Sequence, residues 1–288
     1  MMYTITDLTR DNTEFFADFI GGDMAENIGR INYRGFVLTE GDYRPVAGMI
    51  WRIKKTGASS DAESIVEWIR ADKEDAFNEM LASYKDWINE DEVVRSGVVI
   101  PAKEGKEIKN LLKASGFSVR LTESDLIVAR LSVLSEVNLI KKLRDQPIPD
   151  SIKSLDQITV RTFRNAILRC DRLGKTGICD DLADLSIRWV EEDVSCVSEK
   201  DGEINGMFLF HRKPAGLITA QILICFDNST GVTIPLLMRK FIDKMQEKYD
   251  PDTKVGFDRH NILAMRLSEK LLPSGFGTPI YSGTRDEK

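Results

Sequence analysis

The sequence predicts an α+β fold of two tandem domains, each a mixed and mostly antiparallel sheet flanked by helices. Its 288 residues are enough for two domains of ordinary size. Asn205–Met207 follows Ala47–Met49 by 158 residues, and each Gly-Met pair lies in an expected hairpin. Leu272–Phe276 follows Lys113–Phe117 with its Gly-Phe pair 159 residues later, and each closes a helical pattern. Because these two landmarks agree to within one residue, we interpret the chain as a diverged internal duplication.

The first half, residues 1–134, alternates strand and helix patterns. Its expected elements are a strand at 3–8, a helix capped by Asp11, a hairpin of 35–39 and 46–53, a strand at 64–69, a helix at 74–88, a strand at 93–100, a helix at 105–115 and a closing pair of strands at 117–121 and 125–132. Apolar residues recur at helical spacing from Phe77 to Ile88, which predicts one buried stripe. Gly116 can end the second long helix because glycine tolerates the left-handed conformation.

Residues 135–156 form an expected connector. A helix is predicted at 137–143, and Pro147 and Pro149 prevent regular structure from continuing. The second half, residues 157–288, repeats the order of the first. Its expected elements are a strand at 158–162, one or two helices carrying Leu182, Leu185 and Trp189, a hairpin of 194–198 and 204–210, a strand at 217–226, a helix at 234–249, a strand at 254–259, a helix at 261–272 and a strand at 278–282.

The composition is that of a globular protein, with 42% hydrophobic and 30% charged residues and a net charge of −6. Because phosphate binding needs a basic face, this balance disfavours nucleic acid as the main partner. The N-terminus lacks the basic and apolar regions of a signal peptide. No apolar run approaches the roughly 20 residues that cross a bilayer. We therefore expect a cytoplasmic protein that has no membrane contact.

The cysteine and histidine counts bear on redox and metal chemistry. All four cysteines lie in the second half and none forms a C-x-x-C pair, so we expect reduced thiols. With two histidines in the chain, we expect no metal site.

A local motif strengthens the architectural pattern. Asn261 is followed by Ala264 three residues later, and then by Gly275-Phe276 at the end of the same predicted helix. The motif and the element order together resemble the GNAT family of acyl-CoA-dependent N-acyltransferases. The resemblance covers nearly the whole chain as architecture. It implies acetyl-CoA or another acyl-CoA as cofactor, and a small-molecule or peptide amine as acceptor substrate.

In this family, the loop between the fourth strand and the next helix binds the cofactor pyrophosphate through backbone amides. Exposed amides and the helix dipole both favour an anion there. The corresponding loop of the second half keeps one glycine and has hydroxyl side chains that can donate to phosphate. The residues expected to bind the cofactor are Asn228, Ser229, Thr230, Gly231, Val232, Thr233 and Asn261. The alternative interpretation is an ordinary polar loop that caps the next helix.

The corresponding loop of the first half is Arg70–Asp75. It has no glycine, and three of its six residues are carboxylates. Carboxylates suit a helix start because the dipole stabilises them. They repel a diphosphate, so we expect no cofactor in the first half.

Family members often use a tyrosine four residues after the helix alanine to protonate the departing thiolate. Ser268 occupies that position, so the usual acid is missing. We therefore assign proton transfer to Asp258 and His260, at the end of the strand expected at 254–259. An imidazole titrates near the working range of a general base. The alternative for His260 is a surface or loop-capping role.

Three other reactive side chains have structural interpretations. His211 follows an apolar strand and is expected to be an exposed turn residue. Glu67 lies within an apolar strand, where a carboxylate must be paired or face a cleft. Some family members keep a glutamate base on this strand, and pairing with a neighbouring arginine is the alternative. Cys225 is expected to be buried packing.

Two functional hypotheses remain open. The first is an acyltransferase-like protein in which only the C-terminal half binds acyl-CoA and the N-terminal half is a degenerate copy. The second is a non-catalytic scaffold in which both cofactor sites are lost. The acidic first loop and the missing tyrosine favour the scaffold, whereas Gly231, Asn261 and the Ser229-Thr230 pair favour the enzyme. An aminoacyl-tRNA donor fits a tandem architecture, but the acidic balance disfavours it.

Overall fold

A computed structural model describes residues 3–30, 32–41, 43–55, 62–103, 105–173, 187–226, 230–258, 269 and 277–287. The chain divides into two compact units. Unit 1 comprises Met1–Ser124 and Pro279–Lys288, and unit 2 comprises Asp125–Thr278. These units are not the two halves of the sequence that the repeat predicts, because the last strand of the chain belongs to unit 1.

Unit 1 is built on a mixed sheet. In spatial order its strands are β1 (Thr4–Asp7), β2 (Tyr33–Glu40), β3 (Arg44–Lys55), β4 (Ala62–Ala71), β5 (Val93–Pro101), β12 (Gly277–Asp286) and the beginning of β6 (Ser118–Arg130). Among the described residues of this unit, β4 and β5 pair in parallel, and the pairs β1–β2, β2–β3, β3–β4 and β5–β12 are antiparallel. The predicted mixed and mostly antiparallel sheet is therefore confirmed for this unit.

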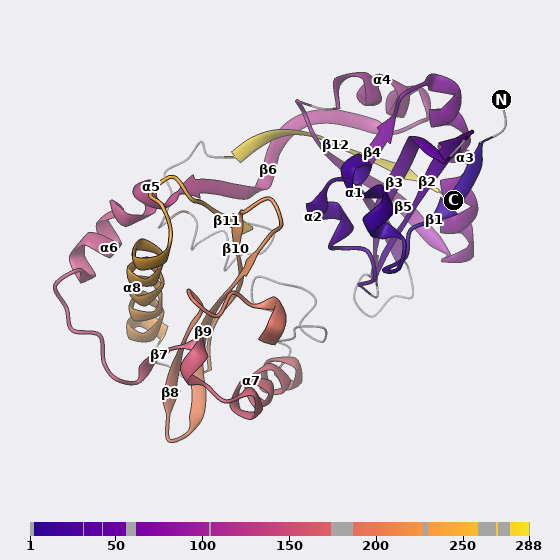
Figure 1. Ribbon diagram of the computed structural model, residues 1–288. Coiled ribbons are helices and arrows are strands. Elements are labelled where there is room, and N and C mark those ends of the chain that lie inside the picture. The colour runs from indigo at the N-terminus through magenta and orange to yellow at the C-terminus, as the bar shows by residue number, and fades with distance from the viewer. Residues whose placement is uncertain are drawn as a thin grey trace. The chain divides into compact units, whose positions relative to one another are not determined.

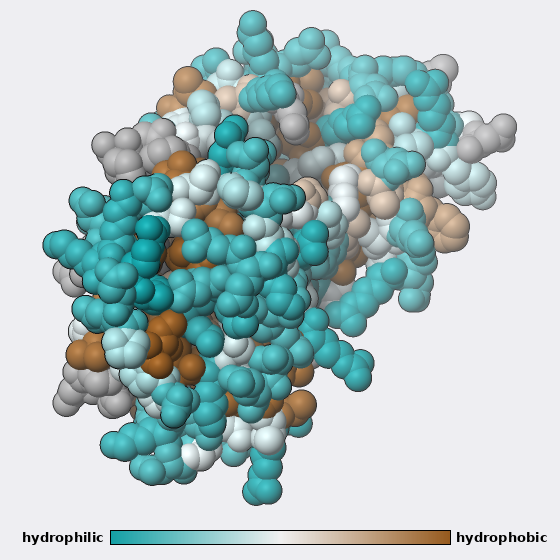
Figure 2. Space-filling model, turned by 60° about the vertical axis from the view of Figure 1, so that its left-hand side comes forward, coloured by the Kyte–Doolittle hydropathy of each residue, from teal (hydrophilic) through white to brown (hydrophobic). Residues whose placement is uncertain are grey.

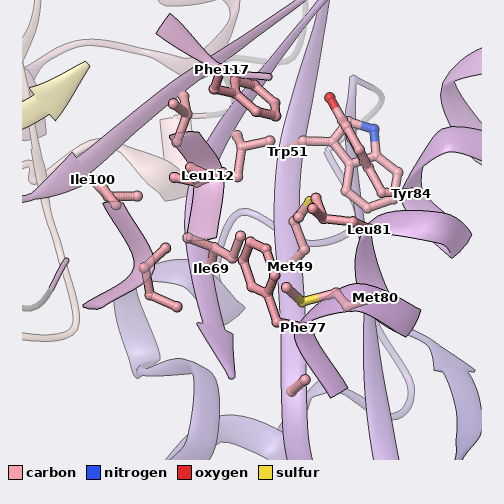
Figure 3. Packing of buried hydrophobic residues seen from close by; sticks show 14 of the residues in the cluster. Met49, Trp51, Ile69, Phe77, Met80, Leu81, Tyr84, Ile100, Leu112 and Phe117 are labelled. Atoms are coloured by element: carbon pink, nitrogen blue, oxygen red, sulfur yellow. The ribbon is translucent and has the colours of Figure 1, made fainter. Parts of the chain in front are cut away.

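Helices cover both faces of the sheet of unit 1. On one face lie η1 (Thr13–Phe16), α1 (Ala17–Ile20) and α2 (Gly22–Ala25), with Phe16 and Ile20 buried. On the other lie α3 (Glu74–Glu90) and α4 (Lys106–Ala114). Figure 3 shows Phe77, Met80 and Tyr84 packed against Met49 and Trp51. The stripe predicted from helical spacing is thus the core-facing side of α3.

Unit 2 has the same plan. In spatial order its strands are the end of β6, β11 (Lys254–Asp258), β10 (Ile218–Cys225), β9 (Glu203–Arg212), β8 (Cys196–Lys200) and β7 (Ile152–Ser154). One face is covered by α5 (Leu131–Ser135), α6 (Asn138–Leu143) and α8 (Thr230–Lys248). The other face is covered by η2 (Leu155–Gln157), α7 (Val160–Arg172) and η4 (Ile187–Trp189). On the α8 face, the ring of Phe210 stacks on Phe241 with a centroid distance of 3.8 Å.

The two halves of the sequence exchange a strand. In unit 1, β5 pairs with β12, which places Thr284 opposite Gly97. In unit 2, β11 pairs with the end of β6, which places Val128 opposite Gly256. Each half of the sequence therefore contributes the strand that completes the other half's sheet. In Figure 1, β12 is the yellow strand among the violet strands of unit 1.

Matching β-bulges fix the register of the duplication. In unit 1, β3 pairs with β4 on both sides of Glu67 but leaves Glu67 itself unpaired. In unit 2, β9 pairs with β10 on both sides of Gln221 and leaves Gln221 unpaired. Glu67 and Gln221 are therefore equivalent bulge residues.

The bulges correct the offset between the halves. Leu209 pairs with Ile222, the residue after the bulge of unit 2, and Ile50 pairs with Trp68, the residue after the bulge of unit 1. Leu209 and Ile50 are therefore equivalent, and they are 159 residues apart. Gly97 pairs with Ile65 in the parallel pair of unit 1, and Gly256 pairs with Thr219 in the parallel pair of unit 2. The two glycines are also 159 residues apart. The 158-residue match of Asn205–Met207 to Ala47–Met49 is therefore wrong by one residue. A one-residue slip moves every side chain to the other face of a sheet.

Three expected elements differ in the structure. The pair of strands at 117–121 and 125–132 is the single strand β6. Residues 158–162 do not form a strand, because the Thr159 hydroxyl accepts a hydrogen bond from the Thr162 amide at 3.2 Å and so helps to start α7. The first strand of unit 2 is instead β7, which lies within the expected connector at 135–156. The helix expected at 261–272 lies outside the described residues, apart from Glu269, which is helical.

The surface shown in Figure 2 is mostly hydrophilic, with hydrophobic side chains in separate patches. Within the described ranges, none of the helices combines the length and the apolar character that a membrane crossing requires.

Candidate functional site

The candidate site of unit 2 lies where its two parallel strands separate. β10 and β11 pair at Ile218–Val255 and at Thr219–Gly256, and these are the pairs registered between the described residues of the two strands. β10 then continues to Cys225 and β11 to Asp258. The bulge at Gln221 lies two residues beyond Thr219, which belongs to the last paired rung, and it bends β10 there. Beyond this pair of residues, the described backbones of β10 and β11 are therefore not joined by registered sheet pairs.

The start of α8 follows β10 and has the features of an anion site. Its first turn contains no acidic residue. A Cβ added to Gly231 would meet no atom of the described residues within 4 Å, and Val232 is 65% exposed. Because the first amides of a helix lack intrahelical partners, this turn presents donors to an open surface.

The structure places the other expected cofactor residues differently. Thr230 and Thr233 belong to the first turn of α8 and not to the loop that the sequence predicts. The Thr233 side chain is buried, and its Cγ2 lies 2.9 Å from the Cβ that a side chain at Gly206 would have, so it faces the sheet. Asn228, Ser229 and Asn261 lie outside the described residues.

The two expected catalytic residues are partly described. Asp258 ends β11, opposite Leu126 of β6. His260 and Ser268 lie outside the described residues. The backbone thus brings Asp258 to the end of a strand that borders the separation of β10 and β11.

His211 is not the exposed turn residue that the sequence predicts. It lies on β9, is only 5% exposed and stacks on Trp189 with a centroid distance of 3.7 Å and an interplanar angle of 5°. Its Nδ1 is 2.7 Å from the carbonyl oxygen of Trp189. The expectation failed because β9 continues past Phe210, and alternation along a strand turns residue 211 to the same face as Leu209.

Polar groups gather on this face at the last paired rung. His211 lies opposite Thr219 on β10, and Thr219 lies opposite Gly256 on β11. The Thr219 hydroxyl is buried and has no hydrogen-bond partner among the described residues. The Gln221 side-chain amide donates to the Thr219 carbonyl oxygen at 3.3 Å. Sequence reasoning misplaced His211 and did not single out Thr219 or Gln221, because only the strand register shows that His211 lies opposite Thr219.

The equivalent place in unit 1 is internally paired. Glu67 Oε1 lies 3.2 Å from Arg52 Nε, and the Tyr33 hydroxyl donates to Glu67 Oε2 at 3.0 Å. Burial, and next the negative charge of Glu67, raise the pKa of Tyr33 above its usual value. Of the two alternatives for Glu67, pairing with a neighbouring arginine is the one that the structure shows.

The start of α3 in unit 1 is acidic and locally satisfied. The Asp75 carboxylate accepts hydrogen bonds from the Tyr3 hydroxyl at 2.8 Å and from the Ala76 amide at 3.0 Å. Lys73 is paired with Glu40 at 2.8 Å. These contacts place a carboxylate at the helix start and use the Ala76 amide and the Lys73 ammonium, which an anion would otherwise contact.

The fold matches solved structures of acetyltransferases. A GCN5-related glucosamine N-acetyltransferase region of a fungal multi-domain GH3 β-N-acetylglucosaminidase matches with a TM-score of 0.62 and 9% identity, over 98% of this chain and 38% of the other. A tandem GNAT protein from the clavulanic acid biosynthesis pathway matches with a TM-score of 0.56 and 8% identity, over 100% and 99% of the two chains. The chain has a tandem GNAT fold.

The tandem GNAT match confirms the fold class that the sequence predicts. The chain spans well under half the length of the fungal protein that it matches. No protein-family model matches the sequence, and no curated protein resembles it in sequence. Among the described residues, no cluster of three or more histidine, cysteine and acidic side chains can hold a metal ion.

Proposed function

We propose that the protein transfers an acyl group from acyl-CoA to an amine, and that unit 2 carries the reaction. The observation that supports this proposal most directly is the start of α8. It follows a strand that separates from its parallel neighbour, it has no acidic residue in its first turn, and it is open at Gly231. The tandem GNAT fold is the second support.

The chain's own residues have distinct proposed roles. The first-turn amides of α8, together with Asn228, Ser229 and Asn261, hold the pyrophosphate of acetyl-CoA or another acyl-CoA. The amine nitrogen attacks the thioester carbonyl carbon, a C–N bond forms and the C–S bond breaks. Asp258 and His260 handle the protons, because Ser268 stands where the family's tyrosine acid is expected.

The acceptor is proposed to be a small-molecule or peptide amine. One structural relative is described as a glucosamine N-acetyltransferase region. An amino sugar is therefore a reasonable first member of a substrate panel, with a polyamine, lysine and a peptide α-amine beside it.

The proposed reaction is tested by mass spectrometry of products formed from acetyl-CoA and this amine panel. We expect an N-acetylated product with the wild-type chain. His260→Gln is expected to lower turnover by roughly 10²-fold, the lower end of what general acid–base catalysis contributes. Affinity for CoA should change little, because backbone amides elsewhere hold the cofactor. Unchanged turnover in this variant would make His260 a structural residue.

A non-catalytic scaffold is the second candidate function. Ser268 in place of tyrosine and the acidic start of α3 both favour it. CoA binding by the wild-type chain without product from any amine in the panel would support this alternative.

A further inference from the structure

The outer face of α7 combines arginines with exposed aliphatic side chains. The inner face of this helix buries Phe163 and Cys170 in the core of unit 2. The exposed residues of the opposite face are Val160, Arg161, Arg164, Leu168 and Arg172. Val160 is 62% exposed and Leu168 is 49% exposed. Protein–protein interfaces have an apolar centre with a polar rim and are enriched in arginine, and this face has that composition.

Unit 1 has an equivalent helical segment. η1 and α1 follow the edge strand β1, and α7 follows the edge strand β7. The two segments cover the same face of their sheets, because Ile50 packs in the cluster with η1 and α1, and the equivalent Leu209 packs in the cluster with α7. The duplication therefore gives the chain two equivalent outward-facing helical surfaces.

The outward surface of η1 and α1 is acidic and aromatic. Phe16 and Ile20 point into the core. The exposed residues recur at helical spacing and are Asp11, Glu14, Phe15 and Asp18. Phe15 is 84% exposed. Because an aromatic ring gains much from leaving water, Phe15 is the side chain here that a partner would stabilise most by covering it.

The charges on these two surfaces remain available to a partner. Among the described residues, Asp11, Glu14 and Asp18 form no ion pair, and the same holds for Arg161 and Arg164. Three exposed carboxylates on one surface thus match three exposed arginines on the other, since Arg172 is also exposed.

The two charged rows are of comparable length. Arg161 and Arg172 are 11 residues apart on one α-helix, which corresponds to about 16 Å at about 1.5 Å per residue. Asp11 and Asp18 are seven residues apart, which corresponds to about 10–14 Å at the rises of α- and 3-10 helices. The acidic row can therefore lie along the basic row with its charges facing arginines.

Contacts inside the chain show how an exposed phenylalanine would be covered. The Arg70 guanidinium lies over the Phe19 ring at 4.6 Å, and the Arg169 guanidinium lies over the Phe226 ring at 4.5 Å. Such cation–π contacts are favourable when the pair is desolvated. An arginine of α7 over Phe15 would repeat this contact between two molecules.

A second copy of the chain is the partner that these observations favour. An anionic membrane or a nucleic acid would also attract the arginines of α7, but the net charge of −6 opposes its approach and the acidic surface would stay uncovered. We propose that the protein associates with itself, with the outer face of α7 in one copy docked against the outward surface of η1 and α1 in another. Because each copy carries both surfaces, the contact either forms twice in a two-fold pair or continues head to tail.

Sedimentation velocity from micromolar to submillimolar concentration tests this association. We expect the wild-type chain to self-associate, and to do so more weakly at high salt, which screens exposed charges. Arg161→Glu combined with Arg164→Glu should weaken association at least about tenfold, because like charges then face each other. Phe15→Ser should weaken it by a similar factor without changing the charge.

The matched control is Lys142→Glu combined with Lys200→Glu. These lysines are exposed on other elements of unit 2, and their reversal changes the net charge as much as the arginine reversal does. We expect the control to associate like wild type. Thermal unfolding of every variant should stay close to wild type, because all the substituted side chains are exposed.

Mixing two charge-reversed chains separates specific docking from general repulsion. The chain with Arg161→Glu and Arg164→Glu has two acidic surfaces, and a chain with Glu14→Arg and Asp18→Arg has two basic ones. Each should stay monomeric by itself. An equimolar mixture should associate again, because every contact then joins opposite charges.

Several results would overturn the proposal. They are a wild-type chain that stays monomeric throughout, a control variant that weakens association as much as the arginine reversal, and a mixture of reversed chains that stays monomeric. A monomeric wild-type chain that binds phosphatidylserine vesicles, and loses this binding in the arginine reversal, would assign the outer face of α7 to an anionic membrane instead.

Discussion

Single residues give the two equivalent helix starts opposite electrostatic character. In α3, the Tyr3 hydroxyl and the Ala76 amide hold the Asp75 carboxylate and lower its pKa, the tyrosine contributing most. In α8, no acidic residue occupies the first turn, and Gly231 leaves the backbone open. The positive end of a helix dipole stabilises a nearby anion, so a carboxylate of the chain at that position competes with a bound phosphate. This contrast is readable from the sequence, since it depends on residue type alone.

A buried cluster of hydroxyl groups in unit 1 is expected to make the free energy of unfolding fall at alkaline pH. The Tyr84 hydroxyl lies 2.7 Å from Ser64 Oγ and 2.8 Å from Ser96 Oγ. Burial raises the pKa of Tyr84 from 10.0 to about 12. The folded state therefore retains a proton that the unfolded state loses. The resulting stability is fully present below pH 10 and disappears as pH rises to about 12.

We expect Tyr84→Phe to lower the free energy of unfolding by about 1–3 kcal/mol at neutral pH, because it leaves buried serine hydroxyls less well bonded. The variant should also lose stability less steeply than wild type above pH 10. Denaturant unfolding at several pH values measures both effects. Tyr43→Phe is the control, since Tyr43 is 78% exposed. Parallel alkaline curves for wild type and Tyr84→Phe would contradict this assignment.

At the scale of elements, a buried ion pair fixes the exchanged strand β12. Arg285 Nε donates to Glu287 Oε1 at 2.8 Å, and these side chains are only 9% and 7% exposed. The Arg285 guanidinium also lies over the Phe117 ring and donates to the Ser115 carbonyl oxygen. The pair therefore joins the end of β12 to the turn after α4.

We expect Glu287→Gln to destabilise unit 1 by about 3 kcal/mol, because it leaves a buried guanidinium without its counter-charge. Asp286→Asn, which removes an exposed pair with Arg95, should change stability by less than about 1 kcal/mol. Tryptophan fluorescence during thermal unfolding reports mainly on unit 1, which holds Trp51, Trp68 and Trp87, whereas Trp189 lies in unit 2. Equal effects of the two substitutions would contradict the role of the buried pair.

The spacing of apolar residues correctly predicted helices and strands that each bury one face of their own segment. The helix expected at 74–88 is α3, and the strand expected at 64–69 lies within β4. Alternation shows that a segment is a strand but does not identify its partner. For this reason the exchange of β12 and β6, and the bulges at Glu67 and Gln221, were not predicted. His211 was misplaced because the apolar run ends at Phe210 while the strand continues through Arg212.

For the whole molecule, strand exchange means that neither half of the sequence is a complete folding unit. Residues 1–134 lack β12, and residues 157–288 lack the part of β6 that pairs with β11. The exchange explains how a chain with a repeated order of elements divides into units that do not match its halves.

A chain that ends at residue 276 tests this interdependence. We expect unit 1 to lose cooperative unfolding and to become sensitive to protease, because β5 loses the partner that registers with it from Ile280 to Asp286. A synthetic peptide of residues 277–288 added in trans should restore part of the protection. Protection in the truncated chain equal to that of wild type would show that β12 is dispensable.

The proposed function requires one acyl-CoA site per chain, at the start of α8. Calorimetric titration with acetyl-CoA measures both the number of sites and their affinity. We expect one site per chain, and loss of binding in Gly231→Glu, because the substitution adds volume and like charge where phosphate approaches. We expect wild-type affinity when Asp72 and Glu74 are both replaced by lysine. Absence of binding in the wild-type chain, or a larger loss of affinity from the Asp72 and Glu74 replacements than from Gly231→Glu, would show that the site does not lie at the start of α8.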